Sequence, residues 1–142
     1  ASLDRNSISI EKFSRWLRAI CTMLLSRNTA ADRLKAIGYV EQAAQVLEDC
    51  SAEGEPEVFP QDDRLWLLGM SYNTGVECLH VSLLDEAKRW FEASTTICRF
   101  VPDGDSRATK VQKFALHVHI CDLLHQKISE TYSQLVERCS SS

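Results

Sequence analysis

Apolar side chains in the first third of the chain recur at intervals of three and four residues, the spacing that gathers them on one face of a helix. Helices are predicted over residues 8–25 and 30–49, so that 8–50 forms a first antiparallel hairpin. Ser7 or Ser9 is expected to cap the first helix, although a lysine stands three positions after Ser9, where a capping box needs Glu or Gln.

A second hairpin is predicted after an acidic, turn-rich stretch at residues 51–61. The helical spacing resumes over 63–81 and again over 83–100, which makes 62–101 the second hairpin. Its boundary signals are Asp62 or Asp63 as the N-cap of the first of these helices, and the tetrapeptide Val101-Pro102-Asp103-Gly104 as the stop of the second.

The most regular pattern lies in the last third, residues 106–138, where spacings of three and four alternate without a Gly or Pro to interrupt them. We expect one long helix whose apolar stripe lies along the preceding hairpin and caps it. The stripe consists of Val111, Phe114, Val118, Cys121, His125, Ile128, Tyr132, Leu135 and Cys139.

The second hairpin has the spacing of a tetratricopeptide (TPR) repeat. Gly75 precedes Ala87 by twelve residues, Phe91 follows four residues later, and Pro102 closes the unit. Glycine lets two helices approach closely, alanine preserves that distance at the crossing, and the aromatic ring fills the groove to the next helix. Gly75, Ala87 and Phe91, together with Trp16, are therefore predicted to be fold determinants.

A partial copy of this pattern is present in the first hairpin. Two triplets share one spacing, namely Ala36, Val40 and Ala43 in the first hairpin and Ala87, Phe91 and Ser94 in the second. They lie 51 residues apart, well beyond the usual TPR period of about 34. The predicted fold class is all-α, with antiparallel helical hairpins of a degenerate TPR (α-solenoid) type and a long C-terminal helix, in one domain over 1–142.

Composition narrows the choice of partner and compartment. The formal net charge of −4 offers no basic surface for phosphate, so no direct contact with nucleic acid is expected. The six cysteines are widely spaced and lie mostly within apolar helical stretches, which favours reduced thiols in a cytoplasmic or nuclear protein. No uninterrupted apolar run approaches the ~18 residues of a membrane span, and no secretory signal opens the sequence.

No catalytic motif is evident, because the sequence lacks a Gly-x-Ser-x-Gly elbow, a glycine-rich phosphate loop and a His-Glu-x-x-His pair. His117, Cys121 and His125 share one helix face and are of zinc-binding types, but the outer two would lie about 12 Å apart. A zinc site would need further ligands, such as Cys78 and His80. We expect no catalytic residue, no metal, no cofactor and no small-molecule substrate.

Several segments, in this order, carry a family resemblance: RWLR at 15–18, FPQDD at 59–63, WL at 66–67, YNTGVECL at 72–79, EAKRWF at 86–91 and VPDG at 101–104. Their order and spacing resemble the meiosis-specific sporulation proteins of the Zip-type TPR family, especially its fungal members. The resemblance spans residues 13–104, with a weaker counterpart, ETYSQL, at 130–135. Residues 112–126 have no counterpart in the family pattern.

The resemblance implies a scaffold and not an enzyme, with this chain forming one portion of a longer helical superhelix on meiotic chromosomes in the nucleus. Its implied partners are other proteins, which join crossover formation to the chromosome axis and promote assembly of the synaptonemal complex. The partner-binding candidates are Asn73, Trp66 and Trp90. Asn73 has two open roles, a buried hydrogen bond or a grip on a partner's backbone, and at least two of the three tryptophans are expected in the core.

Two other functions fit the same pattern. A generic TPR adaptor of the chaperone or complex-assembly type would bind acidic peptide ends in a basic groove, but the spacing does not bring the basic residues of the second hairpin together. Those residues are Arg64, Lys88, Arg89 and Arg99. A zinc-dependent enzyme is the third alternative, and it depends on the histidine–cysteine face of the last helix.

Overall fold

The computed structural model describes residues 9–53 and 59–141, and within these ranges it contains helices and no strand, which confirms the all-α prediction. The helices are α2 (Ile10–Arg27), α3 (Ala30–Glu53), α4 (Gln61–His80), α5 (Leu84–Cys98) and α6 (Gly104–Ser141). The largest difference from the predicted bounds is at the end of α3, predicted at residue 49 and found at Glu53. Ser7 and most of the predicted 51–61 loop lie outside the described residues.

Helix α2 begins and ends on local signals. The Ser9 hydroxyl oxygen accepts a hydrogen bond from the Lys12 backbone N–H at 3.2 Å, so the predicted Ser9 cap is confirmed even without a complete capping box. At the other end, Asn28 adopts a left-handed φ of 54° and its N–H donates to the Leu24 carbonyl. The two-residue link that follows turns the chain back into α3.

The start of α4 differs from the prediction, because neither Asp62 nor Asp63 is its N-cap. Pro60 occupies that position and has no side-chain cap bond. Asp63 serves instead as a link between helices: its two carboxylate oxygens accept hydrogen bonds from the Ser14 hydroxyl at 2.9 Å and from an Arg18 guanidinium N–H at 3.2 Å. The carboxylate that we assigned to the α4 terminus therefore stabilises the contact between α2 and α4.

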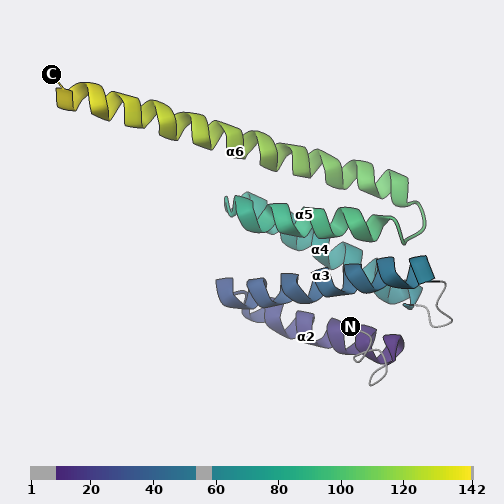
Figure 1. The fold of residues 1–142 in the computed structure, drawn as a ribbon. Coiled ribbons are helices and arrows are strands. Elements are labelled where there is room, and N and C mark those ends of the chain that lie inside the picture. Colours follow the sequence, from purple (N-terminus) through teal and green to yellow (C-terminus); the bar gives the residue numbers. More distant parts are fainter. Residues whose placement is uncertain (1–8, 54–58, 142) are drawn as a thin grey trace.

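The helices are stacked in layers, from α2 at the bottom of Figure 1 to α6 at the top. Short connections make α2 antiparallel to α3 and α4 antiparallel to α5. Helices α4 and α5 connect the layers, since α4 contacts α2, α3, α5 and α6, and α5 contacts α3, α4 and α6. A further link between the hairpins is the ion pair between Arg33 on α3 and Glu86 on α5, with Nε 2.7 Å from Oε1.

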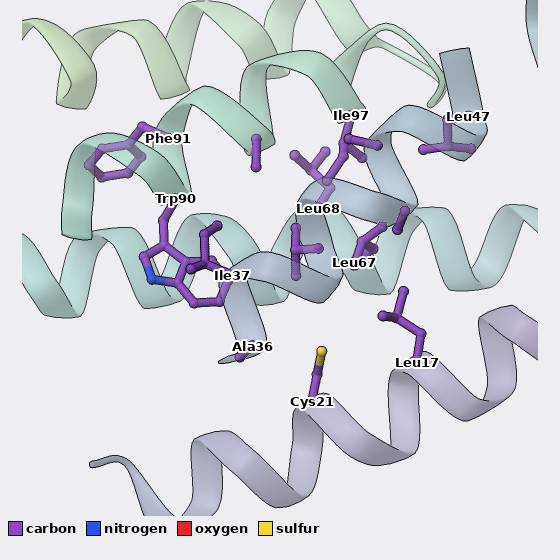
Figure 2. Close-up of a cluster of buried hydrophobic side chains, with 14 of the residues drawn as sticks. Leu17, Cys21, Ala36, Ile37, Leu47, Leu67, Leu68, Trp90, Phe91 and Ile97 are labelled. Atoms are coloured by element: carbon purple, nitrogen blue, oxygen red, sulfur yellow. The ribbon is translucent and has the colours of Figure 1, made fainter. Parts of the chain in front are cut away.

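One apolar core runs through the stack (Figure 2). Trp90 and Phe91 are its largest fully buried side chains on α5, while Leu17 from α2 and Leu67 from α4 enter from the other layers. All six residues of the two equal-spaced triplets are fully buried: Ala36, Val40, Ala43, Ala87, Phe91 and Ser94. The periodicity of the sequence thus identified positions on α3 and α5 that face the same core.

The crossing of α4 and α5 depends on Gly75. A Cβ atom added there would lie 2.8 Å from Cε1 of Phe91, closer than side-chain carbons approach each other, so the ring occupies the space that glycine leaves. Phe91 also stacks on Phe114 of α6, with ring centroids 6.0 Å apart and an interplanar angle of 28°. The predicted roles of Gly75 as the close-approach residue and of Phe91 as the filler toward the next helix agree with this geometry.

Gly104 fixes the turn between α5 and α6. A Cβ atom there would overlap the Cys98 carbonyl oxygen, so only glycine lets α6 start directly beside the end of α5. Before it, Asp103 has a left-handed φ of 57°. Within the described ranges, no helix has both the length and the apolarity that a membrane span requires.

Candidate protein-docking surface

Helix α6 has two halves in different environments. In the proximal half, residues 104–122, Val111 and Val118 are buried against the bundle and Phe114 packs on both α5 and α4. In the distal half, every side chain from residue 123 to residue 140 is exposed. Figure 1 shows why: α6 runs well past the ends of the helices below it.

Helix lengths explain this division. Helix α5 has 15 residues and α6 has 38, so they extend about 22 Å and 57 Å at 1.5 Å per residue. A helix of the length of α5 can therefore cover less than half of α6. The prediction that the last helix caps the second hairpin holds for its proximal half, whereas the distal half caps nothing in this structure.

Large apolar side chains continue into the exposed half. Five of them recur at helical spacing on one side of α6 and retain 46–68% of their exposed area; we call them the distal stripe, and they are Leu124, Ile128, Tyr132, Leu135 and Val136. The other side of this half is mostly polar, with Lys127, Glu130, Gln134, Glu137 and Arg138. The distal half is thus an amphipathic helix whose apolar side has no cover among the described residues.

A groove adjoins the stripe where α6 leaves the bundle. It has a volume of about 880 Å³ and lies between the α4–α5 turn and α6. Leu79, His80 and Leu84 line one wall, and Phe114, His117, Cys121 and His125 line the other. His125 of the groove and Ile128 of the distal stripe are three residues apart, so they are neighbours on one face of α6. The groove and the distal stripe therefore form one continuous surface along this helix.

The three tryptophans lie in different environments. Trp90 has no exposed area, so its assignment as a partner-binding residue is wrong; its indole fills the core between the layers. Trp66 is partly buried, with the Arg18 guanidinium 5.2 Å from its ring centre. Trp16 is 45% exposed and lies edge-on to Tyr39, so it supports the α2–α3 contact from the surface and not from the core. Trp90 lies in the core and Trp66 packs against it, so the expectation that at least two of the three contribute to the core is confirmed.

Asn73 is exposed on α4. The structure gives its side chain no hydrogen bond to any described residue, so the interpretation as a buried hydrogen-bonding amide is wrong. Its amide is free to bond to another molecule, and it lies seven residues, about two helical turns, before His80 of the groove wall. Of the three predicted partner-binding residues, Asn73 is the one that is fully available at the surface.

The histidine–cysteine face of α6 lines the groove but does not form a metal site. His80 comes to the same groove as His117, Cys121 and His125, whereas Cys78, the other ligand considered, is buried on α4. Burial raises the pKa of the Cys78 thiol to about 11, with the neighbouring Glu86 carboxylate adding to the effect. In the described part of the chain, no three His, Cys, Asp or Glu side chains meet in a geometry that could hold a metal ion.

The basic residues of the second hairpin do not form a clamp for an acidic peptide end. The Arg64 guanidinium donates to the Phe100 carbonyl at 2.9 Å. Arg89 and Arg99 pair with Glu41 and Glu48 of α3, so their charges face carboxylates of this chain. These contacts strengthen the link between the hairpins and leave no convergent basic groove around them.

Comparisons with protein-family models, with curated protein sequences and with solved structures returned no match for this chain. The all-α class therefore stands on the structure itself. The TPR-type arrangement, the meiotic family and the binding role stay predictions from the sequence. Sequence reasoning missed the distal stripe as a surface, because it treated the whole apolar spacing of α6 as one buried face; the signal that could have revealed it was the unequal length of the two last predicted helices.

Proposed function

We propose that this chain is a non-enzymatic protein-interaction module, built from degenerate TPR hairpins, that docks a helix along the distal stripe and the adjoining groove. One observation carries the proposal: five large apolar side chains remain about half exposed on a helix that projects from its bundle. Exposed apolar patches of this kind mark interaction surfaces in soluble proteins. A helix laid beside α6 is the simplest cover, since helices pack through stripes with this spacing.

The energetics define what the occupant must bring. Burying the remaining exposed area of the five stripe residues contributes on the order of 5 kcal/mol. Association costs about 4 kcal/mol or more in lost freedom of motion, so this gain alone gives weak binding. The occupant must therefore present an apolar face of its own or also fill the groove beside Phe114 and Leu79.

The finer proposal concerns the cellular role. The family resemblance of residues 13–104 supports a nuclear scaffold in meiotic crossover formation and chromosome synapsis, with crossover or chromosome-axis proteins as partners. An exposed Asn73, about two helical turns before His80 of the groove wall, fits a role in holding a partner's backbone. A generic TPR adaptor that serves chaperones is the competing function, and the same experiment separates the two.

The test is affinity capture from meiotic and vegetative cell extracts, with wild-type chain and with Ile128→Glu as bait. Enrichment of crossover or chromosome-axis proteins from the meiotic extract alone, with loss in Ile128→Glu, supports the proposed function. Capture of chaperones from both extracts favours the generic adaptor. If neither bait retains any protein above the level of an unrelated helical bait, the interaction module is ruled out.

A further inference from the structure

We propose that the occupant of the distal stripe is a second copy of this chain, whose α6 lies antiparallel to the first in a pair centred on Glu130. The inference rests on the proposed function, because it names an occupant for the docking surface described there. Four observations carry it: the spacing along α6, the self-complementarity of that spacing, the position of the bundle, and the apolar area available on one copy.

The spacing is that of a coiled coil. Steps of three and four residues alternate from the end of the proximal half through the distal half, at Cys121, His125, Ile128, Tyr132, Leu135 and Cys139. The same ladder begins in the proximal half with Val111, Phe114 and Val118, which already pack against the bundle. The distal part therefore continues an established helix–helix interface past the point where its intramolecular cover ends.

The ladder is self-complementary when two copies run in opposite directions. With Glu130 at the centre, Ile128 lies opposite Tyr132 of the other copy, and His125 lies opposite its Leu135. Cys121 then faces Cys139 at each end, so small side chains meet small ones and large meet large. Beside the core, the residues at matching levels are Asp122 with Arg138 and Leu124 with Val136, so no like charges meet at these flanking positions.

The position of the bundle selects the antiparallel arrangement. All other described helices lie beside the proximal half of α6, and the distal half extends away from them (Figure 1). In an antiparallel pair the two bundles sit at opposite ends, and the paired segment, residues 121–139, gives a contact about 27 Å long. In a parallel pair both bundles would crowd the same end, where α5 already covers one side of α6.

A second copy also brings the apolar face that the energetics require. The stripe of one chain is buried by the stripe of the other, so the apolar area removed from water is twice that gained by docking a polar helix. No other segment among the described residues offers a comparable uncovered face of matching length. Each chain supplies both surfaces, as an isologous two-fold contact demands.

Sedimentation equilibrium of the wild-type chain tests the pairing. We expect a species of twice the 16.1 kDa chain mass. Ile128→Glu places a carboxylate in the core of the pair twice, by symmetry, and should raise the dissociation constant at least about 100-fold. Leu123→Glu is the matched control: Leu123 is also exposed and apolar, at 50% against 68% for Ile128, but it lies on the side of α6 away from the distal stripe, so the dimer should persist. Ile128 and Leu123 are both exposed, so circular dichroism should show that both variants keep their helices.

Thiol cross-linking tests the direction. With a short bismaleimide, an antiparallel wild-type pair links Cys121 of one copy to Cys139 of the other. Cys121→Ser alone and Cys139→Ser alone then give no link between the distal halves, whereas a mixture of the two variants does. A parallel pair gives the reverse, because each single variant links to itself through its remaining distal cysteine.

Each outcome decides between the two proposals. A wild-type chain that is monomeric at about 100 µM overturns the pairing, as does a dimer that Ile128→Glu leaves intact or one that shows the parallel cross-links. A monomer that still captures meiotic proteins through Ile128 leaves the proposed function standing. An antiparallel dimer that captures no other protein supports the pairing and removes the scaffold function.

Discussion

The two halves of α6 share one sequence pattern and have opposite environments. Val111 and Val118 of the proximal half are buried, while Ile128 and Tyr132 of the distal half, on the same three-and-four spacing, each keep 68% of their area exposed. The pattern therefore identifies a helix face that needs a cover and says nothing about which chain provides it. In the proximal half the cover is α5, and in the distal half none of the described residues provides one.

The same contrast separates the bundle from the projecting helix. In the bundle, apolar burial, the Gly75–Phe91 contact and ion pairs such as Arg33–Glu86 act together across the layers. In the distal half, side-chain hydrogen bonds such as that from the Thr131 hydroxyl to the Lys127 carbonyl join residues of α6 itself. Stability is thus concentrated in the bundle, and the apolar side chains of the distal half are available for binding.

The largest effect that would sharpen this contrast is the loss of a buried ring. Phe91→Ala should lower the free energy of unfolding by about 3–5 kcal/mol, because it leaves a cavity between Gly75 and Phe114. Tyr132→Ala, an aromatic truncation of similar size in the distal half, should change it by about 0.5 kcal/mol or less under conditions where the chain is monomeric. Urea denaturation followed by circular dichroism measures both. Equal losses would show that the distal half is packed in solution.

Overpacking gives the next effect. Gly75→Leu should destabilise the fold by about 1–3 kcal/mol or more, since even its Cβ meets the Phe91 ring. Gly69→Ala, on the same helix, is the control, because a Cβ there meets nothing within 4 Å and the gain in helix propensity should stabilise by up to about 1 kcal/mol. An unchanged melting temperature for Gly75→Leu would mean that α4 and α5 do not cross at this point.

A smaller effect appears at alkaline pH. Burial raises the pKa of the Cys21 thiol from 9.0 to about 11, so the unfolded chain ionises at a lower pH than the folded one. The stabilisation is present in full below pH 9.0 and is lost as the pH rises toward 11. Denaturation at a series of pH values should show this fall. Cys21→Ala should reduce this fall, and a fall that the substitution leaves unchanged would contradict its assignment to the Cys21 thiol.

The smallest effect on stability is expected at Asn73 of α4. It tests whether this exposed residue, like those of the distal half, contributes little to the stability of the fold. Because the Asn73 side chain is exposed and makes no hydrogen bond to a described residue, Asn73→Ala should change the free energy of unfolding by no more than about 0.5 kcal/mol. The Asn73→Ala variant should capture less partner protein than the wild type if the Asn73 amide bonds to a partner. A loss of stability above about 1 kcal/mol would instead support the other predicted role of Asn73, a buried hydrogen bond.

The sequence predicted the helices well because helix formation follows local rules. Periodic apolar spacing, the Ser9 cap and the stop at residues 101–104 act within a few turns of chain, and the helices were found within four residues of their predicted ends. The contact of Phe91 with Gly75 was not predicted, because the spacing placed Ala87 at the crossing and assigned Phe91 to the groove toward the next helix. In the structure the Phe91 ring lies against Gly75 as well as against Phe114. Trp90 could not be placed correctly, because core and surface tryptophans occupy the same apolar face in sequence.

By itself, then, the sequence determined an all-α chain, the positions of its helices and the residues that face a core. Only the tertiary structure decided where the core stops. Burial depends on which neighbour lies beside a residue and how far that neighbour extends, and the 15 residues of α5 cannot cover the 38 of α6. That mismatch in length places half of one apolar stripe in the core and leaves the other half exposed.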